Sequence, residues 1–234
     1  MLTARSNRVR ISKGEKWFRS ILFILSSSPG VYLVYQYYFD SLGVNPFAKL
    51  SHFTGTWAMI FLLLTLLITP LRRWLRSAAK LLSTQNGKRL SDWNYLIRAR
   101  RQVGLFSFFY ACLHCWVYLS LDIGWKLDYF TQDINERPFI ILGVLGFAIL
   151  SLLAMTSPKF IVKKLGSWWR KIHQLIYILV PIVIFHYWLV AKHDDQLPTY
   201  FALIGAVLLL YRFRLIWSLI NNKSSDDGME KFRD

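Results

Sequence analysis

The sequence has few acidic residues, few cysteines and no long polar stretch between its hydrophobic runs. Its 13 Asp and Glu residues stand against 29 Lys and Arg residues, which gives a formal net charge of +16 at pH 7. The two cysteines, Cys112 and Cys115, lie in one apolar run and form no disulfide framework. The sequence contains no P-loop, no dinucleotide-binding glycine fingerprint and no G-x-S-x-G motif. We therefore expect no nucleotide-binding domain in this chain.

Apolar residues are abundant instead. They make up 54% of the 234 residues, and the mean hydropathy is +0.32, which is high for a soluble domain. The sequence predicts an all-α integral membrane protein, a six-transmembrane-helix bundle (17–217) between a cytoplasmic N-terminal segment (1–16) and a polar, disordered cytoplasmic tail (218–234). Six apolar segments are long enough to cross about 30 Å of hydrocarbon: 17–38, 53–71, 102–121, 138–156, 171–190 and 199–217.

The basic residues lie between the apolar segments, and their distribution predicts the orientation. The two termini and the loops 72–101 and 157–171 hold nearly all the Lys and Arg residues. The other loops, 39–51, 122–137 and 191–198, hold more acidic residues than basic ones. Because basic loops stay in the cytoplasm, we expect both termini there. Membrane topology thus explains the positive charge better than nucleic-acid binding does, and we expect no nucleic-acid partner.

The stretch Trp168–Val190 carries two histidines, His173 and His186, in one long apolar run. Thirteen residues of helix separate them by about 20 Å along the axis and by about 140° around it. Ionisable residues are costly inside a membrane and indicate a functional site, and imidazole is a common axial ligand of haem iron. Two histidines that only form hydrogen bonds are the alternative. Pro181 lies between them and would kink or unwind the helix.

His114 lies on another predicted helix, thirteen residues after Arg101, just as His186 follows His173. If Arg101 and His173 both mark the inner membrane boundary, His114 and His186 lie at the same depth on parallel helices. Two histidines in that arrangement can occupy both axial positions of one haem. Cys112 and His114 cannot share a metal ion, because residues two apart point about 200° away from each other on a helix.

We expect the two remaining histidines, His52 and His193, to bind no haem. His52 begins the second apolar segment at its outer end, and His193 lies in an outer loop beside two aspartates. The sixth segment has no ionisable residue before Arg212, which is typical of a scaffold helix.

Four stretches together resemble a known family. They read, in order, HFTGTWAMIFLLLTLLITPLRR, RARRQVGLFSFFYACLHCWVYLSLD, ERPFIILGVLG and AMTSPKFIVKKLGSWWRKIHQLIY. Their order and spacing resemble the MsrQ family, the haem-binding membrane subunits of bacterial periplasmic methionine sulfoxide reductase systems. The family belongs to the ferric-reductase-like transmembrane group.

The resemblance implies a multi-pass protein of the bacterial inner membrane that binds one or two b-type haems and is also associated with FMN. It implies electron transfer from a cytoplasmic flavin reductase or from quinol to a periplasmic molybdopterin methionine sulfoxide reductase. The family's functional histidines match His114, His173 and His186. The wider group has a fourth ligand near the inner face of the third segment, where this chain has no histidine but Arg98, Ala99, Arg100 and Arg101.

At the inner level we expect His173 to bind or adjoin a second cofactor, whose propionates or flavin phosphate would meet four basic side chains: Arg100, Arg101, Arg170 and Lys171. Positive-inside topology alone is the other explanation for these four residues. The chain would be an electron-transfer subunit rather than a complete enzyme. The alternatives are a stand-alone ferric or quinone reductase of the cytochrome b type, and a small proton-coupled transporter with a histidine relay.

Overall fold

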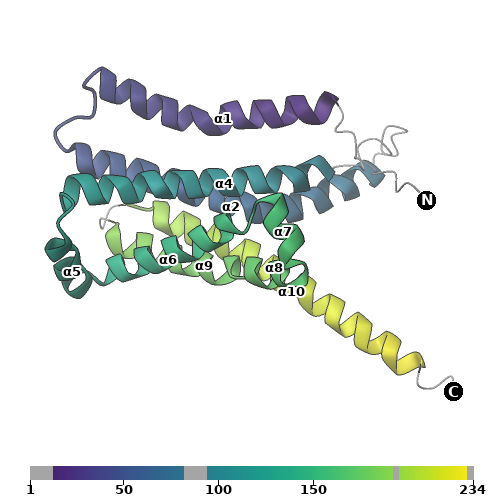
Figure 1. Cartoon of the computed structure of the whole chain (residues 1–234). Coiled ribbons are helices and arrows are strands. Elements are labelled where there is room, and N and C mark those ends of the chain that lie inside the picture. The colour runs from purple at the N-terminus through teal and green to yellow at the C-terminus, as the bar shows by residue number, and fades with distance from the viewer. Residues whose placement is uncertain (1–12, 82–93, 192–194, 231–234) are drawn as a thin grey trace, which may run out of the picture.

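The computed structural model describes residues 13–81, 94–191 and 195–230, and every regular element in these ranges is a helix (Figure 1). Six stretches are long and apolar enough to cross a membrane: 14–38, 46–78, 99–122, 138–155, 167–190 and 197–214. The predicted all-α, six-helix membrane architecture is thus confirmed. The helices are α1 Lys13–Tyr38, α2 Pro46–Leu81, α4 Asn94–Val117, the π-helical turn η1 Tyr118–Asp122, α5 Leu127–Glu136, α6 Pro138–Met155, α7 Lys159–Leu165, α8 Ser167–His173, α9 Ile176–Val190 and α10 Leu197–Glu230.

Helix α2 lies at the centre of the bundle. Half of its most apolar window is buried, against 11% for α1, which runs along one side of the bundle. The main core joins α2 to α6, α9 and α10 through side chains such as Leu63, Leu150 and Leu179. A second cluster packs α2 against α4 around Phe61 and Tyr110. The outer surface of the bundle carries many exposed apolar side chains, as expected of helices in contact with lipid.

Helix α1 is attached to α4 by a few polar contacts. The Tyr110 hydroxyl donates to the Ser26 carbonyl at 2.9 Å and accepts the Gly30 N–H at 2.9 Å. The Gln102 side chain donates to the Arg19 carbonyl at 3.0 Å. These contacts cross-link α1 and α4 at two heights and leave most of α1 facing outward.

Several predicted loops contain helix. Helix α2 continues through Pro70 to Leu81, and α4 begins at Asn94, so much of the basic 72–101 segment is helical. The acidic outer loop holds α5, and the 157–171 loop holds α7 and the start of α8. Helix α10 runs on to Glu230, into the segment 218–230 that the sequence predicted to be a polar, disordered tail. Helix starts and stops are weakly encoded, and the Arg, Leu, Ala and Lys residues of 72–81 have high helix propensity and extend the apolar span of α2.

The short helices α7 and α8 are separated by Gly166. Its backbone has φ 52° and ψ −118°, a conformation that side chains with a Cβ rarely adopt. This turn directs α8 back toward the bundle. Helices α4 and α9 then run in the same direction, toward the end of the bundle that carries α5 (Figure 1).

The helix that carries His173 and His186 is interrupted at Gln174 and Leu175, between α8 and α9, whereas Pro181 lies inside α9. Four N–H groups here bond to the carbonyl three residues earlier, in the manner of a 3₁₀ turn: those of Gln174, Leu175, Tyr177 and Ile178. The interruption lies six to seven residues before Pro181, nearly two turns away, and α9 continues through the proline. The carbonyl that Pro181 leaves without an N–H is that of Tyr177, inside α9, so the proline does not account for the break at Gln174 and Leu175.

This tighter turn changes the angle between the two histidines. A 3₁₀ step rotates by about 120° and an α-helical step by about 100°, so four such steps add about 80°. If each of the four bonds marks one such step, ideal geometry gives about 60° between His173 and His186 instead of about 140°. The tighter turn thus brings the two side chains nearer to one face than an uninterrupted helix would.

Candidate functional site

The structure brings His114 of α4 and His186 of α9 together. Their ring centres are 6.3 Å apart and their planes are nearly perpendicular, at 88°. Both side chains are partly buried among α2, α4, α6 and α9. The expectation that these two histidines share a depth therefore agrees with the geometry.

Each of these two rings is held by one hydrogen bond to a neighbouring helix. His114 Nδ1 lies 2.9 Å from the Ser51 carbonyl of α2, and His186 Nδ1 lies 2.7 Å from the Phe139 carbonyl of α6. A carbonyl oxygen only accepts, so both Nδ1 atoms carry a proton, and in the neutral form of each ring the Nε2 atom keeps a free lone pair. The Thr54 hydroxyl lies 3.4 Å from His114 Nδ1 and donates to the Leu50 carbonyl at 2.7 Å.

The separation of the two rings is compatible with an iron bound between them. Metal-ligating histidines commonly donate their other ring nitrogen to a carbonyl, which fixes the tautomer and the ring orientation. Two metal–nitrogen bonds of about 2 Å, with roughly 1 Å from each nitrogen to its ring centre, would separate the ring centres by about 6 Å. The observed 6.3 Å matches this value. In the part of the chain that the structure describes, no cluster of three or more His, Cys, Asp or Glu side chains forms a metal site.

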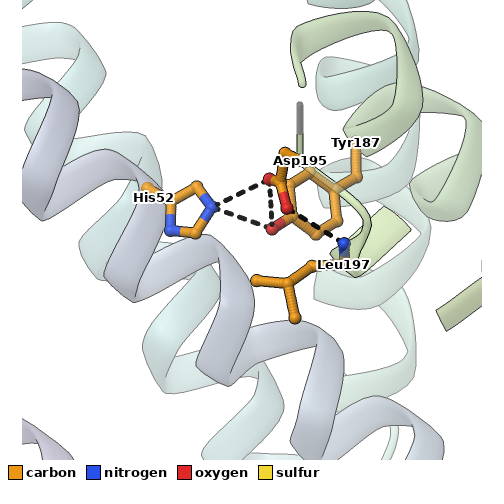
Figure 2. A network of polar contacts seen from close by, with 4 residues as sticks. All are labelled: His52, Tyr187, Asp195 and Leu197. Atoms are coloured by element: carbon orange, nitrogen blue, oxygen red, sulfur yellow. Dashed lines mark hydrogen bonds and ion pairs between the residues drawn. The ribbon is translucent and has the colours of Figure 1, made fainter. Parts of the chain in front are cut away.

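A network of polar contacts lies at the outer end of α2 (Figure 2). His52 Nε2 is 2.9 Å from the Tyr187 hydroxyl and 3.3 Å from Asp195 Oδ2. Asp195 also accepts the Leu197 N–H at 2.9 Å, which fixes the start of α10. His52 is adjacent to Ser51, whose carbonyl holds His114, and Tyr187 is adjacent to His186, so the network joins α2 and α9 next to both paired rings. His193 lies outside the described residues.

At the opposite level, His173 stands without a second histidine. Its Nδ1 bonds to the Trp169 carbonyl at 3.2 Å, and its ring lies against the Trp169 ring with centres 4.2 Å apart. Trp169 in turn donates to the Thr156 carbonyl at 3.1 Å. Arg100 and Arg101 both lie near enough to His173 to interact electrostatically with it. The structure thus places three of the predicted inner residues together.

Arg100 and Arg101 diverge from each other, as neighbours on a helix must. Arg100 faces the bundle and interacts with Arg212 and Tyr177. Arg101 lines a cavity of about 440 Å³ between α1 and α4, together with Arg19 and other residues of α1. The two arginines therefore face different surroundings, although both act on His173.

Arg212 is a residue that the sequence reasoning missed. Its Nε donates to the Tyr177 hydroxyl at 2.7 Å, and this contact places it beside Arg100 at the level of His173. The assignment of the sixth segment as scaffold alone was therefore incomplete. The sequence did contain a signal for this residue: an arginine on an apolar helix usually has a function or an interaction partner.

The other two predicted inner residues lie on the exposed side of α8. Lys171 places its ammonium group over the Trp168 ring, 4.5 Å from its centre, and Arg170 is exposed. Among the described residues, no contact joins either side chain to His173.

Comparison with known proteins agrees with this arrangement. The family model of the ferric reductase like transmembrane component matches residues 54–184, from α2 into α9. The protein-methionine-sulfoxide reductase heme-binding subunit MsrQ of Herminiimonas arsenicoxydans is 41% identical over 202 residues, which cover 85% of each chain. The proteins of the same name from Azospira oryzae and Ralstonia nicotianae are 36% and 34% identical, over 83% and 95% of this chain and 77% and 96% of their own. This chain belongs to the MsrQ family.

Membership of the MsrQ family confirms the resemblance found in the sequence. The ferric-reductase match includes His114 and His173 and ends two residues before His186. The MsrQ relatives extend over most of the chain, so their similarity covers the whole bundle rather than one motif.

Proposed function

We propose that this protein is the haem-binding electron-transfer subunit of a methionine sulfoxide reductase system. The proposal rests on the pair His114 and His186, whose ring centres are 6.3 Å apart. In each ring Nδ1 bonds to a backbone carbonyl, which leaves Nε2 available to bind a metal. The names of the MsrQ relatives, which describe heme-binding subunits, support it. The chain would act as part of an oxidoreductase system rather than as a complete enzyme.

His114 and His186 would be the two axial ligands of a b-type haem at the outer level. When bound there, the haem supplies one-electron chemistry at its iron. The protein's part is to hold both imidazoles in one tautomer and to enclose them among four helices. Because both His114 and His186 would bind the iron, the protein would leave no position open for a substrate, as suits a site for electron transfer.

His173 would bind or adjoin a second cofactor at the inner level, a second haem or FMN. Arg100, Arg101 and Arg212 would hold its propionates or phosphate, because guanidinium groups bind such anions in a bidentate manner. Arg170 and Lys171 would contribute long-range attraction from the exposed side of α8. About 20 Å of helix separates His173 from His186, so the two sites lie near opposite membrane faces.

The proposed direction of transfer follows from the expected orientation. Both termini would lie in the cytoplasm of a bacterium and the bundle in its inner membrane. Electrons would enter near His173, from a cytoplasmic flavin reductase or from quinol. They would leave near His114 and His186 to a periplasmic molybdopterin methionine sulfoxide reductase, which repairs oxidised envelope proteins. The outer loops, with Asp122, Asp128 and Asp195, would form the docking surface.

The test is a reduced-minus-oxidised absorbance spectrum of the purified protein, with haem quantified per polypeptide. We expect a b-type spectrum and one or two haems per chain. A protein that binds no haem would contradict the proposal and favour the proton-coupled transporter. A haem protein that reduces ferric iron or quinone equally well with and without the periplasmic reductase would favour the stand-alone reductase.

A further inference from the structure

The carbonyls that hold His114 and His186 share a feature of sequence. Each is followed, four residues later in the same helix, by a glycine: Gly55 follows Ser51 in α2, and Gly143 follows Phe139 in α6. The two pairs lie on different helices and serve different histidines. The same spacing therefore occurs independently on the two sides of the proposed haem site.

Helix geometry explains why this position matters. The carbonyl of residue i points toward residue i+4 and accepts its N–H, which leaves one lone pair for an outside donor. The Cα–Cβ bond of residue i+4 tilts back toward the N-terminus of the helix, over that carbonyl. An outside donor therefore reaches the second lone pair most easily when residue i+4 has no Cβ.

The distances show that both imidazoles use this space. A Cβ on Gly143 would lie 2.9 Å from Cε1 and 3.2 Å from Nδ1 of His186. A Cβ on Gly55 would lie 3.2 Å from both Cε1 and Nδ1 of His114. Contacts below 3.0 Å are not tolerated without movement, and Cε1 is bonded to both ring nitrogens. A displacement there would disturb the Nδ1–H bond and the direction of the Nε2 lone pair together.

We propose that Gly55 and Gly143 are positioning residues for the two histidine ligands, because they leave the Ser51 and Phe139 carbonyls open to the imidazole Nδ1–H. This inference rests on the proposed function, since it concerns the ligands of the haem. Neither glycine touches the iron; each acts through the orientation and basicity of its histidine.

Helix α6 provides a matched control. Gly146 lies one turn after Gly143 and faces the same helix, α9, but a Cβ there would lie 2.8 Å from Cγ1 of Val183. The steric overlap is as severe as at Gly143, and only the neighbour differs. Gly143→Ala and Gly146→Ala therefore impose the same kind of strain between α6 and α9, against a proposed ligand in one case and a valine in the other.

The experiment measures haem per polypeptide, the optical spin-state spectrum and the haem midpoint potential in Gly143→Ala, Gly55→Ala and Gly146→Ala. Loss of a partner that orients a metal ligand typically costs 10- to 100-fold in affinity. We expect a loss of this order for Gly143→Ala, a smaller one for Gly55→Ala, and retained haem for Gly146→Ala. In the haem that remains, the weaker Nδ1–H bond makes the imidazole a poorer donor, so the potential should become more positive.

A double variant separates positioning from packing. If Gly143 acts only through His186, adding Gly143→Ala to His186→Ala should cause no further loss of haem. Circular dichroism and size-exclusion chromatography of all variants check that the bundle still folds. Gly55→Ala, with the milder overlap, keeps the test open if Gly143→Ala fails to fold.

Equal haem loss in Gly143→Ala and Gly146→Ala would assign both effects to helix packing and overturn the inference. Unchanged haem content and potential in both Gly143→Ala and Gly55→Ala would overturn it as well, while the haem site itself would stand. Retention of six-coordinate haem by His186→Ala would instead refute the proposed function, whatever the glycine variants show.

Discussion

The polar side chains at the two ends of the bundle, histidines at one and a histidine with arginines at the other, have different surroundings. At the outer end, two histidines face each other, and a backbone carbonyl binds one nitrogen of each ring. At the inner end, one histidine packs on a tryptophan and is surrounded by arginines. The outer site is composed of two histidine rings, each held at Nδ1 by a backbone carbonyl, whereas the inner site is composed mainly of arginines.

This difference indicates what each end requires to be complete. The outer pair presents two imidazole rings whose spacing suits the proposed haem iron. The inner group has Arg100 beside Arg212, and among the described residues no ion pair with an acid neutralises either of them. Like charges held together in a membrane are costly unless an anion joins them. The inner site is thus suited to the acidic groups of a cofactor.

The strongest test of the comparison removes a ligand from the outer pair. We expect His114→Ala and His186→Ala each to lose the outer haem or to leave it five-coordinate, because each would remove one axial ligand. The double variant should resemble the single ones, since both residues serve one site. Haem per polypeptide and the spin-state spectrum measure the effect. Full six-coordinate haem in either single variant would exclude that residue as a ligand.

The inner histidine should behave differently. We expect His173→Ala to keep the outer haem, because about 20 Å of helix separates the two levels. Reduction from the cytoplasmic side should nevertheless fail or slow strongly, because the inner cofactor would be lost or displaced. The measurement is the rate of haem reduction by a cytoplasmic-side donor in oriented vesicles. A normal rate with normal cofactor content would show that His173 only packs on Trp169.

Much of this comparison was predictable from the sequence. Apolar length predicted the six spans, and equal spacing from Arg101 to His114 and from His173 to His186 predicted which histidines meet. The sequence could not predict the carbonyls that hold the rings, because a backbone oxygen has no signature in the side-chain pattern. The sequence also placed the interruption of the helix at Pro181, whereas the structure has it nearly two turns earlier, at Gln174 and Leu175.

Arg212 was missed for a related reason. Its role depends on the packing of α10 against α9. This packing brings Arg212 into contact with Tyr177, which lies 35 residues earlier in the sequence. Local periodicity carries no information on such a contact. The spacing of Ser51 to Gly55 and of Phe139 to Gly143 was visible in the sequence, but it acquires meaning only when the facing histidines are known.

A smaller effect should follow from removing charge at the inner site. We expect Arg212→Gln and Arg100→Ala to weaken retention of the inner cofactor about tenfold, because a hydrogen bond to a charged group contributes about 1.5 kcal/mol or more. Arg101→Ala should weaken it less, since that side chain also faces α1. The outer haem should be unaffected. Cofactor per polypeptide after extensive washing gives the result.

Arg214→Gln is the matched control for Arg212→Gln. Arg214 lies two residues further along α10 and is exposed, so its loss removes one charge at the same end of the bundle without touching Tyr177. If both variants retain the cofactor equally, the arginines at this level serve topology alone. Tyr177→Phe, which removes only the hydroxyl that accepts from Arg212, should give a partial effect.

The smallest effect is expected at the outer network of His52, Tyr187 and Asp195. His52→Ala and Tyr187→Phe remove hydrogen bonds between α2 and the start of α10, and each should lower stability by about 1 kcal/mol. Both should keep full haem content, because the network is adjacent to the ligand segments but touches no ligand nitrogen. Thermal unfolding and haem per polypeptide, measured on the same samples, separate the two properties. If His52→Ala loses haem while His114→Ala retains a six-coordinate iron, the assignment of the outer pair is wrong, because the free Nε2 of His114 would then have no role and the exposed ring of His52 would have to supply the ligand.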